Sequence, residues 1–386
     1  MNAPDAIVVG SGPNGLAAAL TLARSGLEVE VLEAAATPGG GCRTAELTLP
    51  GFRHDICSAV HPLAAASPFF LGTDLASHGV RLLTPRVAFA HPLDGGRAAA
   101  VSGPVTETAA GLGADGRAYQ RLMALLFRDA AAITAGVLAP LRTVPEHALA
   151  VARFGALGVL PASVLAHRLH TDEGQALLAG VAAHAIQPLT APLTGGFALL
   201  LAMLAHSAGW PVVEGGSGRI IDALAAELTS LGGRVVTGHE VKQLDELPPA
   251  RLLLFDTSPR QFLQIAGDRL PAGYRRSLER FRYGPGVCKV DWALAGPVPW
   301  SADACREACT VHLGGTFAEV ARSEAEVAAG RHPARPYCII TQPGVVDPTR
   351  APAGQHALWG YCHVPADSNI DMADVIEAQI ERFAPG

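Results

Sequence analysis

The pattern of hydrophobic positions at the start of the chain alternates between strand-like and helix-like segments. Residues 7–9, Ile-Val-Val, predict a buried strand, and the Ala/Leu-rich stretch that ends at Gly26 predicts a helix. A glycine-containing turn at 10–15 separates the two. The segment 27–33, LEVEVLE, then predicts a second strand with Glu33 at its end. Strand, turn, helix and strand follow one another in the order of a βαβ unit.

Two later segments repeat this alternation. Residues 214–241 give a Gly-rich entry, an amphipathic helical pattern, a stop at Gly232–Gly233 and a short strand. Because this repeats the helix–Gly–strand plan of the first unit, we expect its strand to join the same sheet. Residues 252–267 predict one more buried strand, followed by a loop and a helix.

The remainder of the chain divides into a helical part and a β-rich part. The insert 82–209 is rich in Ala and Leu, is broken by prolines and predicts several helices. After about Pro271 the pattern changes to short β-like runs separated by Pro/Gly turns. These runs are VCKVDWAL (287–294), ACTVHLGG (308–315), PYCIITQPG (336–344) and HALWGYCHVP (356–365). They predict a mostly antiparallel sheet.

The glycine turn after the first strand has the spacing G-x-G-x-x-G. Gly10 allows a tight strand-to-helix turn, Gly12 lets the backbone approach a pyrophosphate, and Gly15 lets helix and strand pack closely. The helix N-terminus offers free N–H groups and a positive dipole end to the phosphates. Glu33 lies about 20 residues on, where an acid accepts hydrogen bonds from a ribose. We therefore predict a dinucleotide site, with an ordinary αβ turn as the alternative. The predicted contacts are Gly10, Ser11, Gly12, Pro13, Asn14, Gly15, Glu33 and Ala34.

Composition and charge narrow the class of protein. A chain of 386 residues that is 49% hydrophobic and 17% charged is long enough for two or three domains with large cores. The net charge is −6 with no basic cluster, so we expect no nucleic-acid partner. Seven cysteines without small-domain spacing favour reduced thiols, and the first strand leaves no room for a signal peptide. We expect a cytoplasmic protein.

Two apolar stretches are the longest candidates for membrane contact. Both 196–210 and 148–166 are short for a membrane span, and the second contains Arg153 and Pro161. We expect both to form buried helices. An interfacial role for one of them, and hence a peripheral membrane contact, stays open.

A second glycine cluster follows the predicted ribose acid, in GGGCRTAELTLPGFRHD at 39–55. An NAD site does not need it, whereas a longer cofactor that continues to a flavin ring does. Here the sequence resembles the phytoene dehydrogenase-like flavoproteins, which are related to carotenoid desaturases and to flavin amine oxidases. Their Gly-Gly doublet followed by Arg and Thr is matched by Gly39, Gly40, Arg43 and Thr44. One departure is that Gly41 and Cys42 stand where many relatives have Arg directly after the doublet.

The resemblance covers nearly the whole chain and implies both a fold and a cofactor. It implies an α/β protein with a Rossmann-type FAD-binding domain made of 1–81 and 210–270. The substrate domain, an antiparallel sheet plus helices, would comprise 82–209 and 271–386. FAD would contact Gly40, Gly41, Cys42 and Arg43 in addition to the first loop, and the backbone of Val241 would lie at the adenine end. The alternative for the Val241 segment is an αβ unit without a ligand contact.

The chain ends with VIEAQIERFAPG at 375–386, within a predicted helix and its exit loop. The resembling proteins continue to a further Gly-rich segment that closes the FAD domain. We therefore expect this chain to be a fragment of a longer protein.

Few residues stand out as catalytic, because flavin chemistry is largely the cofactor's own. His61 falls where the resembling proteins bring the chain near the flavin, and a packed or solvent-bound histidine is the alternative. Lys289 and Asp291 share one face of a predicted strand and are acid–base candidates, with a structural ion pair as the alternative. We expect no metal site, because Cys305, Cys309 and His312 lack a fourth ligand nearby.

The resemblance implies an FAD-dependent oxidoreductase. It would remove hydride from an apolar substrate of isoprenoid or lipid type and pass electrons to oxygen, a quinone or another acceptor. Two alternatives stay open: an enzyme like the flavin amine oxidases, and a non-catalytic flavin- or nucleotide-binding partner protein. The sequence leaves the identity of the substrate, the acceptor and the oligomeric state open.

Overall fold

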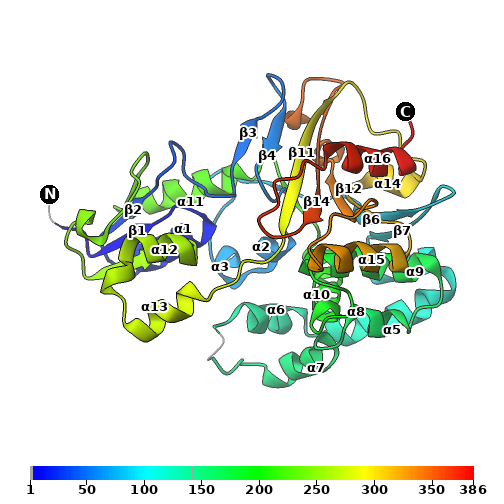
Figure 1. The fold of residues 1–386 in the computed structure, drawn as a ribbon, viewed down its shortest axis with the longest axis horizontal. Helices are drawn as coiled ribbons and strands as arrows, with labels where there is room; N and C mark the ends of the chain where they lie inside the picture. The colour runs from blue at the N-terminus through cyan, green and yellow to red at the C-terminus, as the bar shows by residue number, and fades with distance from the viewer. Residues whose placement is uncertain (1–2, 141–142) are drawn as a thin grey trace.

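The computed structural model describes residues 3–140 and 143–386. Figure 1 shows a smaller lobe that carries the N-terminus and a larger lobe built around a second sheet. The smaller lobe contains a parallel sheet in the order β10 (Leu252–Phe255), β1 (Ala6–Val9), β2 (Val29–Leu32) and β9 (Arg234–Val236). The predicted strand after 214 therefore does join the first sheet, as the repeated pattern indicated. The strand predicted at 252 forms β10, but the prediction that it is buried was wrong, because β10 lies at the edge of the sheet with Leu252 and Leu253 exposed.

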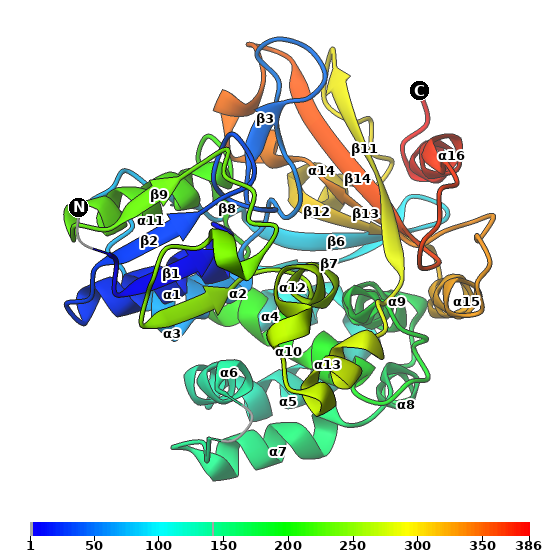
Figure 2. The same ribbon diagram turned by 60° about the vertical axis from the view of Figure 1, so that its left-hand side comes forward.

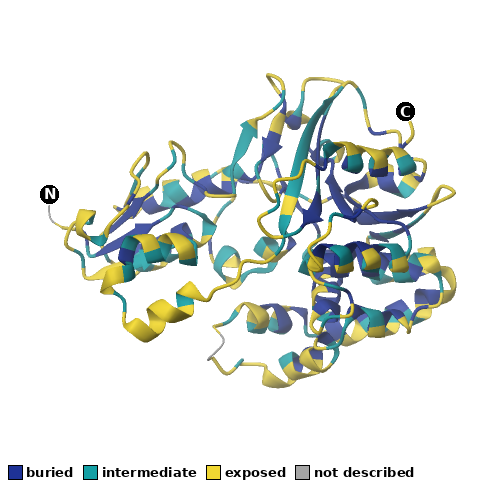
Figure 3. Cartoon of the chain, viewed as in Figure 1, coloured by how far each residue is buried: buried dark blue, intermediate teal, exposed yellow. Residues whose placement is uncertain are grey.

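Helices cover both faces of the parallel sheet. One face packs against α1 (Pro13–Arg24) and α11 (Gly218–Ser230), whose apolar residues share a core with β1 and β2. The other face packs against the segment that follows β9 and against α12 (Pro259–Ala266). The next helix, α13 (Ala272–Glu279), buries no residue and lies beside α12 on the outside of the lobe (Figure 3). A parallel sheet covered on both faces explains why β1 and β2 are buried at every position.

The larger lobe is built on a six-stranded sheet. Its order is β11 (Gly286–Leu294), β14 (His356–Val364), β13 (Cys338–Thr341), β12 (Ala308–Leu313), β6 (Val87–Leu93) and β7 (Arg97–Ser102). Neighbours are antiparallel except β12 and β6, which are parallel. The four predicted β runs after Pro271 all form strands of this sheet.

The prediction that the insert 82–209 forms helices was wrong for the first part of that segment. Residues 87–93 and 97–102 form β6 and β7, which pair as a hairpin and complete the sheet. The Ala-rich sequence of β7 favours a helix on its own, and pairing with β6 together with burial against helices overrides that preference. β5 (Leu82–Leu83) pairs with β8 (Val212–Val213), and β3 (Thr44–Glu46) pairs with β4 (Arg53–Asp55).

The two faces of the larger sheet have different neighbours. An apolar face packs against α14 (Asp303–Glu307) and α16 (Ala373–Phe383). The opposite face meets α9 (Asp172–Ala182), α10 (Thr194–Ser207) and α15 (Phe317–Ala328). Figure 1 shows this layering, with α16 on one side of the strands and α10 on the other.

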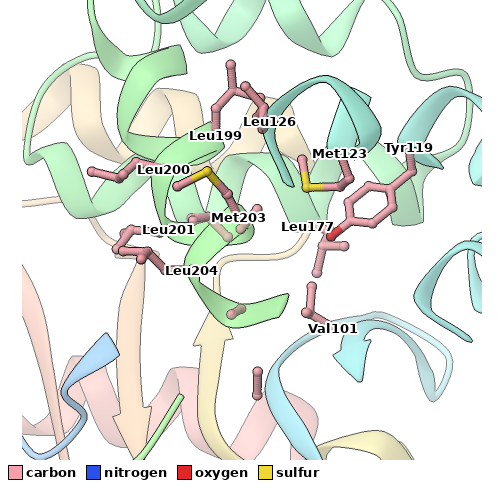
Figure 4. Close-up of a cluster of buried hydrophobic side chains, with 14 of the residues drawn as sticks. Val101, Tyr119, Met123, Leu126, Leu177, Leu199, Leu200, Leu201, Met203 and Leu204 are labelled. Atoms are coloured by element: carbon pink, nitrogen blue, oxygen red, sulfur yellow. The ribbon is translucent and has the colours of Figure 1, made fainter. Parts of the chain in front are cut away.

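A group of helices completes the larger lobe. It contains α4 (Val105–Gly111), α5 (Gly116–Phe127), α6 (Ala130–Leu138), α7 (Ala148–Gly158) and α8 (Ala162–Ala166) around α10. Figure 4 shows Met123 of α5 and Met203 of α10 within its apolar cluster. The predicted burial of 196–210 is confirmed in α10, whereas the prediction for 148–166 was wrong for α7. That helix lies on the outside and buries only Ala150, Phe154 and Gly158. Among the described residues, no helix combines the length and apolarity that crossing a membrane requires.

Candidate functional site

A cleft of about 710 Å³ opens at the carboxyl ends of β1, β2 and β10. This is the edge at which open α/β sheets bind ligands. The predicted contact residues that line it are Gly10, Ser11, Gly12, Pro13, Asn14, Glu33, Ala34, Gly40, Gly41 and Val241. The glycine turn, the acid and the doublet, far apart in the chain, thus meet in one place.

The fingerprint glycines are required by close approach of neighbouring atoms. Gly10 has φ +104°, and a Cβ there would lie 2.5 Å from the carbonyl oxygen of Asp256. A Cβ on Gly15 would collide with the carbonyl oxygen of Gly10. Gly12 caps the N-terminus of α1, and Gly40 passes so close that its Cβ would lie 3.2 Å from the Gly12 Cα. The doublet therefore packs directly against the fingerprint turn.

The Glu33 carboxylate is held in place by the same turn. Ser11 donates to Oε2 through its backbone N–H at 3.0 Å and its hydroxyl at 2.5 Å, and the Ala35 N–H donates to Oε1 at 2.8 Å. Burial alone would raise the pKa of Glu33, but these hydrogen bonds outweigh burial and lower it. An ionised carboxylate with remaining acceptor sites fits the hydroxyls of a ribose.

The segment after β9 forms the side wall beside Glu33. The His239 N–H donates to the Glu33 carbonyl and the Gly238 N–H donates to the Ala35 carbonyl, each at 2.8 Å. Val241 follows, lines the cleft and is buried against Ile7. Its position is that of the predicted adenine wall, and the contact itself stays a prediction.

Asp256 is a cleft residue that the sequence analysis missed. It follows β10 directly and its Oδ2 accepts the Gly15 N–H at 2.9 Å, at the N-terminus of α1. A carboxylate there is stabilised by the helix dipole. The sequence did contain a signal for Asp256. It is an acidic residue directly after a predicted strand, as Glu33 is after β2.

Cys42 and Arg43 do not line the cleft, although a contact with FAD was predicted for both. The Cys42 thiol donates to the Ser217 carbonyl at 3.3 Å, and burial raises its pKa to about 12. Arg43 donates through Nε to the Gly40 carbonyl at 2.7 Å. Thr44 donates to Oδ1 of Asp55 at 2.7 Å. These residues fix the course of the chain beyond the doublet.

A buried ionic network joins the two lobes, and nothing in the sequence pattern indicated it. Arg350 donates to Oδ2 of Asp55 at 2.5 Å, and both side chains are buried. Asp55 also accepts the Ser217 N–H at 2.7 Å. Asp347 accepts the Gly215 N–H at 2.8 Å. The loop that carries Arg350 is thereby tied to the N-terminal end of α11 in the smaller lobe.

A second cavity, of about 460 Å³, lies between residues 56–64, α10 and the face of the larger sheet opposite α16. Predicted candidates His61 and Lys289 both line it, and Asp291 does not. His61 shares a 2.8 Å hydrogen bond with Ser217, and burial lowers its pKa to about 4, so it is neutral near pH 7. Trp359 and Tyr361, stacked at 5.7 Å, form another part of the wall.

Lys289 and Asp291 form an ion pair on β11. Lys289 donates to both carboxylate oxygens of Asp291, at 2.5 and 2.6 Å, and lies 5.4 Å from the ring centre of Trp359. Asp291 lies 3.4 Å from the ring of His54, whose pKa is lowered mainly by burial. The shared face of the strand was predicted correctly, and the ion pair is the structural alternative named for these residues.

The cysteine and histidine motif does not form a metal centre. Cys305 and Cys309 are buried, and His312 pairs through Nε2 with Nε2 of His184 at 2.9 Å. Within residues 3–140 and 143–386, no group of three or more His, Cys, Asp or Glu is arranged to hold a metal ion. All seven cysteines are free thiols.

Comparison with known families identifies the first part of the chain. Residues 8–68 match the family model described as an NAD(P)-binding Rossmann-like domain. The smaller lobe is a Rossmann-like nucleotide-binding domain. A rat relative, pyridine nucleotide-disulfide oxidoreductase domain-containing protein 2, is 25% identical over an alignment of 428 positions, which covers 92% of this chain and 72% of the relative.

Solved structures extend the likeness to both lobes. Putrescine oxidase bound to putrescine superposes with a TM-score of 0.59 at 17% identity, covering 99% of this chain and 82% of the oxidase. The Rab GDI of Plasmodium falciparum superposes with a TM-score of 0.60 at 11% identity, covering 99% and 86%. The predicted fold class is confirmed. At these identities the likeness shows the fold.

Proposed function

We propose that this protein is an FAD-dependent oxidoreductase resembling phytoene dehydrogenase, which acts on an apolar substrate of isoprenoid or lipid type. The observation that carries the proposal is that the nucleotide cleft and the inner cavity adjoin. Gly41 lines the cleft and Cys57 lines the cavity, and a Cβ on Gly41 would lie 3.0 Å from the Cys57 Sγ. A cofactor that extends past the doublet reaches the cavity, which suits the length of FAD.

The residues of the cleft suit the parts of such a cofactor. The α1 N-terminus at Gly12 would hold the pyrophosphate, Glu33 the ribose and the Val241 wall the adenine. When bound, FAD supplies the hydride acceptor. The cavity contributes an apolar surface, including Leu201 and Ile339, that binds the substrate and excludes water.

Turnover by FAD-loaded protein tests the proposal. We expect reduction of a quinone or of oxygen with a member of a carotenoid, polyprenoid and lipid panel, and none with putrescine. Leu201→Trp fills the cavity and should abolish turnover while FAD stays bound. Leu125→Trp, at an exposed position of α5, is the matched control and should retain turnover.

Two other functions would be revealed by the same assay. Turnover with amines alone would indicate an enzyme like putrescine oxidase, whose fold this chain shares. FAD binding without any turnover would indicate a non-catalytic binding protein. The Rab GDI, whose name is not that of an oxidoreductase, shares the fold equally well.

A further inference from the structure

Two helices of the larger lobe expose apolar residues on their outer sides. α6 and α7 lie at the lower edge of the lobe, with α5 and α10 between them and the six-stranded sheet (Figure 2). The exposed residues of α6 are all apolar: Ala131, Ala135, Val137 and Leu138. Those of α7 are Ala148, Leu149, Ala152, Arg153, Gly155 and Ala156. A helix that is apolar on all sides is normally buried in a protein core or in a membrane.

Close packing on the inner side of α7 fixes which side faces outward. α6 meets α7 where a Cβ on Gly136 would collide with Val151. α7 meets α10 where a Cβ on Gly158 would lie 3.3 Å from the Gly196 Cα, beside the buried ring of Phe154. Because these contacts occupy one side of α7, its other side is left to solvent.

The larger of these exposed side chains form an apolar surface on helices that contact one another. We call it the helical surface, and it consists of Phe127 at the end of α5, Val137 and Leu138 on α6, Leu149 on α7 and Val159 directly after α7. Leu149 is 65% exposed and Val159 is 50% exposed. Figure 3 shows α7 as largely exposed. An exposed apolar patch of this kind marks a site that binds another protein or a membrane.

Unpaired arginines border the helical surface. Arg117, Arg121 and Arg128 are spaced by four and seven residues, which places them on one exposed side of α5. Among the described residues none of the three forms an ion pair. On α7, Arg153 lies 3.8 Å from Asp129, the residue next to Arg128. The positive charge therefore continues from α5 to α7.

The helical part of the lobe is positively charged in a chain that is negatively charged as a whole. Residues 116–140 and 143–170 carry five arginines and two acidic residues, Asp129 and Glu146, which gives a net charge of +3. The whole chain has a net charge of −6. An excess of positive charge around exposed apolar side chains is complementary to a surface that is both anionic and apolar.

This combination decides between the classes of partner. A symmetric dimer through the helical surface would bring the unpaired arginines of two copies together, because both copies use the same patch. A lipid bilayer with anionic headgroups fits both features. Its headgroup boundary accepts apolar side chains, and its phosphates attract arginines.

α10 links the helical surface to the inner cavity. Phe197 is 47% exposed and follows Gly196, the residue that packs on α7. Leu201 lies one turn further on the same side of α10 and lines the cavity. The side of α10 that begins beside α7 therefore ends at the cavity wall, where the proposed function places an apolar substrate.

We propose that the helical surface docks on a lipid bilayer that contains anionic phospholipids. In the docked state Leu149 and Val137 insert at the boundary between headgroups and acyl chains, and the arginines of α5 contact lipid phosphates. The inference goes beyond the proposed function, because docking requires neither bound FAD nor turnover.

Cosedimentation with vesicles tests the proposal. The purified full chain, of measured FAD content, is mixed with vesicles of equimolar phosphatidylglycerol and phosphatidylcholine, or with vesicles of phosphatidylcholine alone. We expect the protein to sediment with the anionic vesicles and to remain in solution with the neutral ones. Raising the salt concentration should weaken the binding, because salt screens the attraction between arginines and phosphates.

Two variants separate the apolar from the electrostatic contribution. Leu149→Gln should weaken binding to anionic vesicles about tenfold, because it removes an inserted side chain. Leu231→Gln, at an exposed leucine of the smaller lobe, is its control and should bind like wild type. Arg121→Gln should weaken binding about fivefold. Arg331→Gln, at an exposed arginine outside the helical surface, should not weaken it.

A tryptophan placed on the helical surface reports insertion directly. Leu149→Trp should bind at least as tightly as wild type, and vesicles with brominated acyl chains should quench more of its fluorescence than that of wild type. Leu231→Trp should show no additional quenching. This measurement depends on a variant that keeps the surface apolar, so loss of the fold is not a concern.

The inference would be overturned by absence of binding to the anionic vesicles, by equal binding to both kinds of vesicle, or by binding that either Leu149→Gln or Arg121→Gln leaves unchanged. Self-association without vesicle binding, weakened by Leu149→Gln, would instead assign the surface to a second copy of the chain. Failure to bind FAD would refute the proposed function, and docking on vesicles would still be measurable.

Discussion

The nucleotide cleft and the inner cavity are built in different ways. The cleft depends on backbone: the turn 10–15 and the doublet Gly39–Gly40 approach each other only because side chains are missing. The cavity depends on side chains delivered by separate segments, from 56–64, from α10 and from strands of the larger sheet. A site built from the backbone requires glycines at fixed spacing, which can be recognised in the sequence. A site built from side chains can use residues that are scattered over the chain.

The largest effect should come from blocking the backbone site. Gly12→Val places a branched side chain where the α1 N-terminus would meet the pyrophosphate, and its Cβ alone would lie 2.8 Å from Oδ2 of Asp256. We expect the variant to lose bound FAD almost completely, as measured by absorbance and mass spectrometry. Gly273→Val, where a Cβ has open space, is the control and should retain FAD. Wild-type FAD content in Gly12→Val would mean that the cofactor binds elsewhere.

The cavity depends on the network that joins the lobes, and Asp55→Asn tests this. The change keeps an acceptor for Ser217 and removes the nearer of the two buried carboxylates that face Arg350, leaving Asp347 at 3.9 Å. Breaking a buried ion pair is strongly destabilising, so thermal unfolding should shift clearly to lower temperature, by less than if no carboxylate remained. Asp245→Asn removes the exposed pair with Arg269 and should change the midpoint little. An unchanged midpoint in Asp55→Asn would contradict the role of the network.

The sequence predicted most of the cleft and little of the cavity. Gly10, Gly12 and Glu33 were found because each fulfils a local requirement at a fixed distance from a strand. The Arg350–Asp55 pair joins residues far apart in the chain and follows from no local pattern. His184 stands in a helical segment without any motif, and only the packing of that segment on the larger sheet brings it to His312.

Acid should destabilise the protein through buried histidines in and around the cavity, which the cleft lacks among its described lining residues. His61, His91 and His184 are held neutral in the folded state, with pKa values of about 4, 4 and 3, while in the unfolded chain they bind protons below about pH 6.5. The unfolded state therefore gains protons as the pH falls from 6.5 towards 4, and stability decreases by about 1.4 kcal/mol per pH unit for each histidine.

Thermal unfolding between pH 7.5 and 5 measures this dependence. His91→Gln keeps a donor for the Gly315 carbonyl and removes one titrating group, so its midpoint should fall less steeply with acid. His147→Gln changes an exposed histidine and should follow the wild-type curve. Parallel curves for wild type and His91→Gln would show that His91 does not titrate as described.

The smallest expected effect concerns the cleft residue that the sequence analysis missed. Asp256→Asn keeps an oxygen for the Gly15 N–H and removes a negative charge beside the expected pyrophosphate. We expect FAD to bind more tightly by about 1 kcal/mol, or about fivefold, in a fluorescence titration. Asp303→Asn, on the exposed surface of the other lobe, should leave the affinity unchanged. Weaker binding in Asp256→Asn would indicate that the carboxylate itself holds part of the cofactor.

The β-hairpin 87–102 shows the same limit of sequence analysis in the fold. Its Ala-rich second strand favours a helix locally, and pairing with β6 in the sheet decides otherwise. The strand β1 was predicted well because burial on both faces makes it a short apolar run. The edge strand β10 was found by its apolar run although Leu252 and Leu253 are exposed. Local patterns thus identified the smaller lobe, in which the order helix, glycine turn and strand occurs more than once.

The most direct test of the account is the visible absorption spectrum of the purified protein after incubation with FAD and gel filtration, with mass identification of the released cofactor. We expect flavin absorption bands and about one FAD per chain in the wild-type protein, and neither in Gly12→Val. A protein that carries no flavin, or that releases NAD instead, would contradict the assignment of the cleft and with it the proposed oxidoreductase.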